Sequence, residues 1–335
     1  MRRVDLEFVI FTLSFQLPGM TIGIDMMGGD HAPLEAVKGV RDFLTSSAGT
    51  IRLVLIGDEA AVAPLLQEYG LESHAAITLV HAPEVIGYHE HPTKALREKT
   101  KSSIAIGFHL LASGKTNAFI SAGNTGAMLV GALFSIKALE GVIRPTISTI
   151  IPQLNGRTGL LLDVGLNTDC KPEQLNQFAV MGGVYARLIL GIENPRVGLL
   201  NVGEEEGKGN LLAQATYPLL KANQHIHFSG NIEGRDIFMN KADVMVCDGF
   251  TGNIILKMAE SLYDIGESRA PGDAYFSRFN FEQYGGTPVL GVAKPVIIGH
   301  GISGATAFDN MIKLAALMLE KEVLDIMRNE LKVDA

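Results

Sequence analysis

The chain has 335 residues, a length that suits one large domain or two moderate ones. Apolar residues make up 47% and charged residues 19%, which excludes a disordered chain, and the net charge of −8 argues against nonspecific nucleic-acid binding. Two cysteines are too few for a disulfide framework, and no Cys/His cluster has the spacing of a zinc site, so we expect a reduced, cytoplasmic setting.

Residues 1–19 combine two arginines with an apolar run, as a signal peptide does. Asp5 and Glu7 interrupt the approach to this run, and no small-x-small cleavage site follows. The run is also shorter than the about 20 residues that cross a bilayer. We interpret 1–19 as a non-essential extension, with an added edge strand or a membrane-touching segment as the alternatives. Residues 20–335 would form the main α/β domain, which could consist of two subdomains around a cleft.

Short β-branched and apolar runs alternate with helical patterns. The predicted strands are 21–25, 51–57, 77–82, 117–121, 146–151, 158–165, 196–203, 225–230, 243–249 and 295–300. The clearest predicted helices are 35–44, 173–190, 252–265 and one long helix over 305–332. This alternation predicts an α/β fold with a mostly parallel sheet and helices on both faces, an α/β/α sandwich. Ligands of such folds bind at the carboxyl ends of the strands.

The first strand-end loop, "DMMGGDHAP", leaves Asp25, Asp30 and His31 beside two glycines that permit close backbone approach. A tight turn with an Asp cap is the alternative to a functional site. In "SAGNTGAML", Asn124, Thr125 and Gly126 open a helix whose free N–H groups and dipole favour an anion. A simple capped turn is the alternative here.

The stretch "LDVGLNTDCKPEQL" places Asp163 and Asn167 at a strand end and Pro172 at a helix start. Cys170 could be proposed as a nucleophile, but no His partner is near it in the sequence. We therefore expect Cys170 to be a buried or inert thiol.

The stretch "NVGEEEGKGN" looks like a phosphate loop but lacks the four-residue spacing and the hydroxyl residue of a Walker motif. Lys208 can still present an ammonium group to a phosphate or to a developing oxyanion. We expect the neighbouring glutamates, Glu204 among them, to hold Lys208 by charge pairing. A solvated ion pair at a helix start is the alternative.

The stretch "CDGFTGNIILK" repeats the order of strand, glycine turn and helix, with Asn253 at the predicted helix start. Alone this is a weak cap signal, but together with the other loops it indicates several polar loops that meet at one anion. No GxGxxG follows a strand, so a dinucleotide-binding fingerprint is missing. The stretch "HPTKALREKTKSS" is basic in an otherwise acidic chain, either as a solvated helix face or as a docking patch for an acidic partner. Its cations are Lys94, Arg97, Lys99 and Lys101.

Many long motifs occur in order from about Met20 to the C-terminal helix: "IDMMGGDHAP", "SAGNTGAM", "LLDVGLN", "FAVMGGVYA", "PRVGLLNVGEEEGKGN", "GNIEGRDI", "DVMVCDGFTGNIILK" and "YGGTPVLGV". Together they closely resemble the PlsX-type bacterial phosphate acyltransferases. This resemblance implies transfer of a long-chain fatty acyl group from acyl carrier protein to inorganic phosphate, which gives acyl phosphate for phospholipid synthesis. It also implies a fold similar to the phosphotransacetylases and the isocitrate/isopropylmalate dehydrogenases.

The resemblance further implies a cytoplasmic homodimer, peripheral at the membrane, that supplies a membrane glycerol-3-phosphate acyltransferase and needs no cofactor or metal. Phosphate, with a second pKa of about 6, can attack a thioester directly, so no covalent acyl-enzyme is expected. By resemblance, Lys208 and Asn253 are the expected catalytic residues. The residues expected to bind phosphate or substrate are Asp30, His31, Asn124, Thr125, Gly126, Asp163, Asn167 and Glu204. The basic residues 94–101 would dock the carrier protein.

One departure from the family lies between "SLYDIGES" and "FSRFNFEQYGG", where the family has a longer, partly apolar helical hairpin and this chain has only "RAPGDAY". Either this protein lacks the hairpin or the sequence omits it, and membrane association is in question in both cases. Two other functions are compatible with the fold. A dehydrogenase of the isocitrate type would need nicotinamide and metal fingerprints that the sequence lacks, and a non-catalytic regulatory protein would bind the carrier protein without turnover.

Overall fold

Strands and helices alternate through the computed structural model, which describes residues 19–47 and 51–332. The chain forms two compact units. Of the described residues, unit 1 contains 138–281 and 323–332, and unit 2 contains 19–47, 51–137 and 282–322. The predicted extension over 1–19 lies outside the described residues except for Gly19, and an arrangement of subdomains around a cleft stays a prediction.

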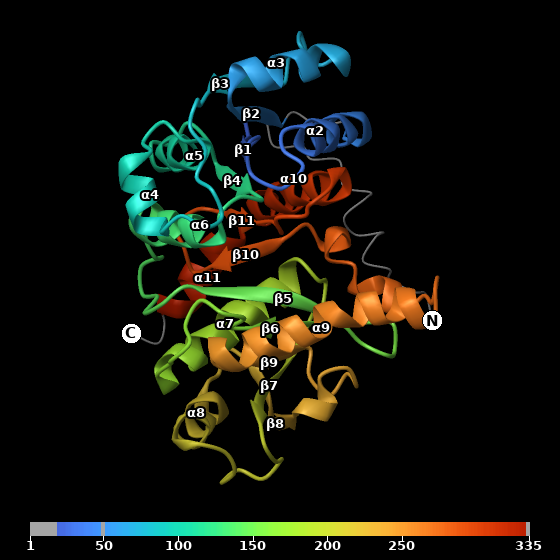
Figure 1. Cartoon of the computed structure of the whole chain (residues 1–335). Helices are drawn as coiled ribbons and strands as arrows, with labels where there is room; N and C mark the ends of the chain where they lie inside the picture. The colour runs from blue at the N-terminus through green and yellow to red at the C-terminus, as the bar shows by residue number, and fades with distance from the viewer. Residues whose placement is uncertain (1–18, 48–50, 333–335) are drawn as a thin grey trace. The chain divides into compact units, whose positions relative to one another are not determined.

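Unit 2 is an α/β unit built on parallel strands (Figure 1). Its strands are β1 (Thr21–Asp25), β2 (Arg52–Gly57), β3 (Ile77–His81), β4 (Ala118–Ser121), β10 (Thr287–Leu290) and β11 (Val296–Ile298). Its helices are α2 (Leu34–Ser46), α3 (Glu59–Glu68), α4 (Pro92–Glu98), α5 (Ser103–Ala112), α6 (Thr125–Gly131), the π-helical η1 (Ala132–Ile136) and α10 (Ala305–Glu320).

The strand order in unit 2 is β3, β2, β1, β4, β11 and β10. All neighbours pair in parallel except β10 and β11, which are antiparallel, with Thr287 opposite Ile298. Four consecutive residues of β1, 22–25, are buried, as expected for a strand with helices on both sides. The carboxyl ends of β1 and β4 therefore lie at one edge of the sheet, where Asp25 and Ser121 meet.

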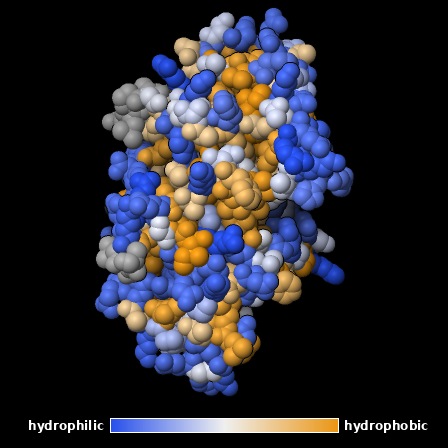
Figure 2. Space-filling view, turned by 90° about the vertical axis from the view of Figure 1, so that its left-hand side faces the viewer, coloured by the Kyte–Doolittle hydropathy of each residue, from blue (hydrophilic) through white to orange (hydrophobic). Residues whose placement is uncertain are grey.

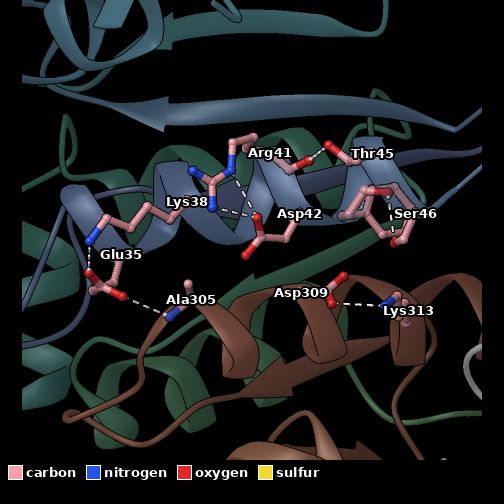
Figure 3. A network of polar contacts seen from close by, with 10 residues as sticks. Glu35, Lys38, Arg41, Asp42, Thr45, Ser46, Ala305, Asp309 and Lys313 are labelled. Carbon is pink, nitrogen blue, oxygen red and sulfur yellow. Dashed lines mark hydrogen bonds and ion pairs between the residues drawn. The ribbon is translucent and has the colours of Figure 1, made fainter. Parts of the chain in front are cut away.

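Helices α2 and α10 pack against each other in unit 2 (Figure 3). Glu35 of α2 accepts a hydrogen bond from Lys38 at 2.7 Å and another from the backbone N–H of Ala305 at 2.9 Å, so it also satisfies the start of α10. The hydrogen bond from Lys38 is the main reason that the pKa of Glu35 lies below its ordinary value. Further along α10, Lys313 donates to Asp309 at 2.8 Å, and both side chains are buried.

Unit 1 is a second α/β unit, in which α9 crosses in front of the strands in the view of Figure 1. Its strands are β5 (Thr146–Pro152), β6 (Thr158–Leu162), β7 (Arg196–Asn201), β8 (His227–Glu233) and β9 (Val244–Val246). Its helices are α7 (Pro172–Leu188), α8 (Leu211–Ala222), α9 (Gly249–Arg269) and α11 (Val323–Lys332), with the 3-10 turns η2 (Gly234–Asp236) and η3 (Phe276–Phe279). A further 3-10 turn, η4 (Phe281–Tyr284), runs from the end of unit 1 into unit 2 along the chain.

The strand order in unit 1 is β5, β6, β9, β7 and β8, and only the β5–β6 pair is antiparallel. Because β6, β9, β7 and β8 run parallel, their carboxyl ends lie at one edge of the sheet. Three polar loops of unit 1 therefore begin at this edge: 163–171 after β6, 201–210 after β7 and 247–248 after β9. The predicted mostly parallel α/β fold is confirmed.

One prediction about an element is wrong, and one strand was missed. The region 305–332 is not one helix but two, α10 in unit 2 and α11 in unit 1, because Glu322 adopts a left-handed φ of 50° that no α-helix can continue through. Strand β10 was not predicted, since its "TPVL" contains a proline and pairs in the antiparallel sense with β11.

The segment "RAPGDAY", which is shorter than the matching segment of the family that the sequence resembles, forms a compact turn between α9 and η3. Asp273 accepts hydrogen bonds from the backbone N–H groups of Tyr275 and Phe276. The ring of Tyr275 meets that of Phe279 edge to face, with centroids 5.3 Å apart. The chain thus returns directly onto the end of α9.

The surface is not uniformly polar. On the face that Figure 2 shows, hydrophobic residues gather in patches between hydrophilic ones. None of the helices within residues 19–47 and 51–332 combines the length and the hydropathy of a membrane-spanning segment.

Candidate functional site

The loop 201–210 of unit 1 presents Lys208 on a fixed backbone. The side-chain amide of Asn201 donates to the carbonyl oxygen of Lys208 at 3.1 Å. Gln214 of α8 donates to the carbonyl oxygens on both sides of Lys208, at 3.1 and 3.0 Å. Three successive carbonyl groups are thus held by amide side chains, while the Lys208 side chain is exposed.

Gly209 makes this arrangement possible. Its φ of +96° lies in the left-handed region that side chains disfavour, and a Cβ atom there would be 2.2 Å from the Oδ1 atom of Asn201. Only glycine at position 209 therefore leaves room for the Asn201 side chain to donate its hydrogen bond to the carbonyl oxygen of Lys208.

The predicted pairing of Lys208 with its neighbouring glutamates is wrong. Glu204 forms an ion pair with Lys241, and Glu206 pairs with Lys221 at 2.9 Å. Within the part of the chain that the structure describes, no carboxylate lies within ion-pair distance of the Lys208 ammonium group. These two glutamates form ion pairs with lysines that lie far from them in the sequence, so the charge of Lys208 remains available to an anion.

The loop after β6 is organised by the carboxylate of Asp163, which is fully buried. Its oxygens accept hydrogen bonds from the backbone N–H groups of Gly165, Leu166 and Asn167 and from the side-chain amide of Asn167. Burial raises the pKa of Asp163 above its ordinary value, and these hydrogen bonds oppose that shift. Because its oxygens are used inside the loop, Asp163 shapes the site, and its predicted contact with phosphate stays a prediction.

Asn253 lies one turn inside α9 and does not cap it, contrary to the prediction. The cap is Asp248, which accepts from both the N–H and the hydroxyl of Thr251 at 2.9 Å. The amide of Asn253 is exposed and donates one N–H to the carbonyl oxygen of Val164 at 3.2 Å. The Asp163 loop and the first turns of α9 thereby orient this amide together.

Gly252, just before Asn253, allows α9 to approach the Asp163 loop. A Cβ atom at this position would be 1.8 Å from the carbonyl oxygen of Asp163. The close packing of α9 against the loop therefore requires a glycine at position 252. This packing fixes the distance between the helix and the loop.

Burial disfavours the thiolate form of both cysteines of unit 1. Cys170 is half-buried, its Sγ atom lies 3.4 Å from the carbonyl oxygen of Asn167, and burial raises its pKa to about 12. Cys247 is buried, and burial raises its pKa well above the ordinary value. Since the thiolate is the reactive form, this agrees with the expectation of a buried or inert Cys170.

The other predicted site residues lie in unit 2, and Asn124 is the most constrained of them. It is almost fully buried, and its Oδ1 atom caps α6 by accepting from the N–H of Ala127. Its Nδ2 atom donates to carbonyl oxygens of the 87–90 segment, the shortest contact being 2.9 Å to Gly87. The amide thus holds two segments together, and phosphate binding by Asn124 stays a prediction.

Thr125, the first residue of α6, is exposed, and so are Asp30 and His31 in the turn before α2, whereas Gly126 packs against Pro92. Asp25, in contrast, is buried and accepts hydrogen bonds from the N–H of Met27 and the hydroxyl of Ser121, at 2.9 and 2.6 Å. Burial raises the pKa of Asp25.

In the basic segment 94–101, Lys99 pairs with Glu90 at 2.6 Å and donates to the carbonyl oxygen of Val85. Its ammonium group therefore has a structural role at the end of α4. The side chains of Lys94, Arg97 and Lys101 are exposed.

Sequence reasoning missed Asn201 and Gln214, which hold the Lys208 loop. The signal for Asn201 was its place directly after an apolar strand; for Gln214 no local signal exists. Within the described ranges 19–47 and 51–332, no group of three His, Cys, Asp or Glu side chains could hold a metal ion.

The fold and the polar loops at the strand ends define a class of α/β enzymes. The structure is similar to that of a phosphotransacetylase from Streptococcus pyogenes, with a TM-score of 0.67 at 16% identity, over 97% of this chain and 100% of that one. The fold is therefore that of the phosphotransacetylases.

The sequence identifies the family within this fold. The family described as "Fatty acid synthesis protein" matches residues 20–268. A phosphate acyltransferase of Dictyoglomus turgidum is 43% identical over 323 residues, which cover 91% of this chain and 95% of the relative. One of Thermoanaerobacterium thermosaccharolyticum is 41% identical over 94% of this chain and 97% of the relative. The chain belongs to the phosphate acyltransferase family and is an acyltransferase.

Proposed function

We propose that this enzyme transfers a long-chain fatty acyl group from the thioester of acyl carrier protein to inorganic phosphate, and that the reaction is reversible. The acyl phosphate formed would enter the synthesis of phosphatidic acid and other phospholipids. The observation that carries this proposal is Lys208, an exposed ammonium without a carboxylate partner among the described residues, on a loop fixed by amide side chains.

The reaction needs no covalent acyl-enzyme. A phosphate oxygen attacks the thioester carbonyl carbon, the carbonyl electrons move to oxygen, and collapse of this intermediate breaks the C–S bond and releases the thiolate of the carrier. Phosphate carries close to two negative charges near neutrality, since its second pKa is about 6. A thiolate with a pKa of about 8.5 leaves readily, so a strong general acid is not needed. The raised pKa values of both thiols of unit 1 agree with this direct route.

The protein then has two tasks, to neutralise charge and to orient the thioester. Lys208 would neutralise the phosphate or the oxyanion. Asn253 uses one amide N–H on Val164 and would offer its second N–H to the acyl carbonyl oxygen. Removing a single such donor in an acyl-transfer enzyme lowers kcat by about 10²–10³-fold.

The partners belong to this proposal too. The exposed cations Lys94, Arg97 and Lys101 would dock the acidic carrier protein, while Lys99 supports the end of α4. We further propose a cytoplasmic homodimer, peripheral at the membrane, that supplies a membrane glycerol-3-phosphate acyltransferase. In unit 2, the exposed Thr125, and Asp30 and His31, would contribute to substrate binding.

The test is thioester loss from a long-chain acyl carrier protein, with and without inorganic phosphate, with hydroxylamine to trap acyl phosphate. We expect phosphate-dependent release with a trapped hydroxamate. Lys208→Ala should lower turnover at least a hundredfold, while Lys115→Ala, at an exposed lysine of unit 2, should not change it. Absence of phosphate-dependent release would refute the proposed reaction, and turnover of Lys208→Ala within a few-fold of wild type would refute the role of Lys208.

A further inference from the structure

A half-open cavity of about 330 Å³ lies in unit 1 at the carboxyl ends of β7 and β9. Its wall is mostly aliphatic and comes from both strands and from the first turns of α8 and α9. The residues that define it best are Leu199, Leu200, Leu212, Ala213, Cys247 and Ile255.

The side-chain oxygens on the wall of this cavity already have hydrogen-bond partners. Asn210 accepts from the N–H of Ala213 as the cap of α8, and Asp248 accepts from Thr251 as the cap of α9. Asn201 holds the carbonyl oxygen of Lys208. No residue of the wall is among the buried polar atoms that lack a partner in the described chain. An anion would meet the carboxylate of Asp248, so the wall offers mainly apolar contact.

The cavity is bounded by the same two segments that carry the proposed catalytic residues. Asn201 and Asn210 are the two ends of the loop that presents Lys208. Thr251 and Ile255 lie on α9 on either side of Asn253 in sequence. A thioester carbonyl between Lys208 and Asn253 would therefore have its alkyl chain next to an apolar cavity.

Helix α9 also offers an apolar approach to this cavity. Met258 is two turns beyond Thr251, and helical spacing places both on one side of α9 with Ile255. Met258 is 66% exposed, so an aliphatic strip runs from the surface of α9 toward the cavity wall.

We propose that this cavity holds the distal part of the fatty acyl chain and limits the length of chain that the enzyme accepts. This inference rests on the proposed function, which supplies the acyl thioester. An apolar cavity of roughly 150 Å³ binds benzene, so by proportion this one accommodates about a dozen carbon atoms. Each methylene that moves from water into the cavity should improve binding about fourfold.

Opposite substitutions at Ile255 test the cavity. Ile255→Trp reduces its volume and Ile255→Ala enlarges it, while Ile265→Trp, at a half-exposed site further along α9, is the matched control. For each variant, kcat/KM is measured with carrier-protein thioesters of four to sixteen carbons, and thermal melting confirms folding.

We expect wild type and Ile265→Trp to prefer long chains over the four-carbon donor. In Ile255→Trp this preference should fall at least tenfold, as the loss of two or more seated methylenes implies, while four-carbon turnover stays near wild type. Ile255→Ala should keep the preference or extend it to longer chains. An unchanged chain-length profile in a folded Ile255→Trp would overturn the proposal, and so would an equal loss at every length.

A binding measurement separates this proposal from the proposed reaction. The fluorescent fatty acid cis-parinaric acid is titrated into each variant and displaced with decanoate. Weaker binding to Ile255→Trp than to wild type and Ile265→Trp supports the cavity even if no donor shows phosphate-dependent release, an outcome that would refute only the reaction. Equal binding to all three proteins overturns the cavity.

Discussion

The change of Asp163 to asparagine tests whether the loop after β6 is held as the hydrogen bonds indicate. Oδ1 of Asp163 accepts from the N–H groups of Gly165 and Leu166, and Oδ2 accepts from the backbone N–H and the side-chain amide of Asn167. An asparagine can serve the first pair of donors with its carbonyl oxygen. Its NH₂ group then faces the second pair, so two buried donors lose their acceptor.

Each buried donor without a partner costs about 1–3 kcal/mol, so Asp163→Asn should lower the free energy of unfolding by about 4 kcal/mol. A domain of 150–250 residues loses roughly 2–4 °C of Tm per kcal/mol, which predicts a drop of about 10 °C. Because Asn253 donates to Val164 in this loop, turnover should fall as well. A displacement of about 1 Å in a catalytic group can cost a hundredfold in rate.

The matched control is Asp25→Asn in unit 2. There two of the donors are the hydroxyls of Ser121 and Ser103, which can rotate and accept from the new NH₂ group, so fewer fixed N–H donors face it than at Asp163. We therefore expect less than half the loss of Tm that Asp163→Asn causes, in melting curves of both variants at pH 7. A Tm of Asp163→Asn within about 2 °C of wild type, or equal losses in the two variants, would show that the geometry of the donors does not decide stability here.

Three further outcomes follow from the structure. Burial alone would raise the pKa of Asp243, but the hydrogen bonds from Arg196 outweigh burial and lower the net pKa. This carboxylate therefore stabilises the fold above its unfolded pKa of about 3.8, and the stabilisation is lost as the pH falls through its folded pKa. Asp243→Asn should therefore be less stable than wild type in urea at pH 7, with a difference that shrinks below pH 4; a constant difference at all pH values would contradict this. Gly209→Ala should lower acyl transfer at least tenfold with little change in Tm, because the loop it distorts is exposed, and activity within twofold of wild type would count against the fixed-loop argument. Lys313→Met leaves the buried Asp309 without its cation and should cost about 3–5 kcal/mol in urea denaturation, whereas Lys313→Met with Asp309→Leu should come close to wild type, and equal losses would refute the pairing argument.

The sequence determined the features that depend on neighbouring residues. The alternation of apolar runs and helical patterns predicted the α/β fold, and every predicted strand has a counterpart in the structure. Local chemistry also predicted Asn124 as a helix cap and Pro172 as a helix start, because capping involves residues within one turn of each other. Cys170 was expected to be inert from the same kind of local reading, and burial gives the physical reason.

The tertiary structure alone decided which partners the charged and polar side chains take. Glu204 pairs with Lys241 and not with Lys208, because the fold brings together cations and carboxylates that no sequence period relates. The split of 305–332 into two helices in different units follows from the left-handed backbone at Glu322. A glycine at this position would have indicated a helix end in the sequence, but a glutamate does not. The cavity between the starts of α8 and α9 is likewise a product of packing, since its wall comes from segments that meet only when β7 and β9 pair.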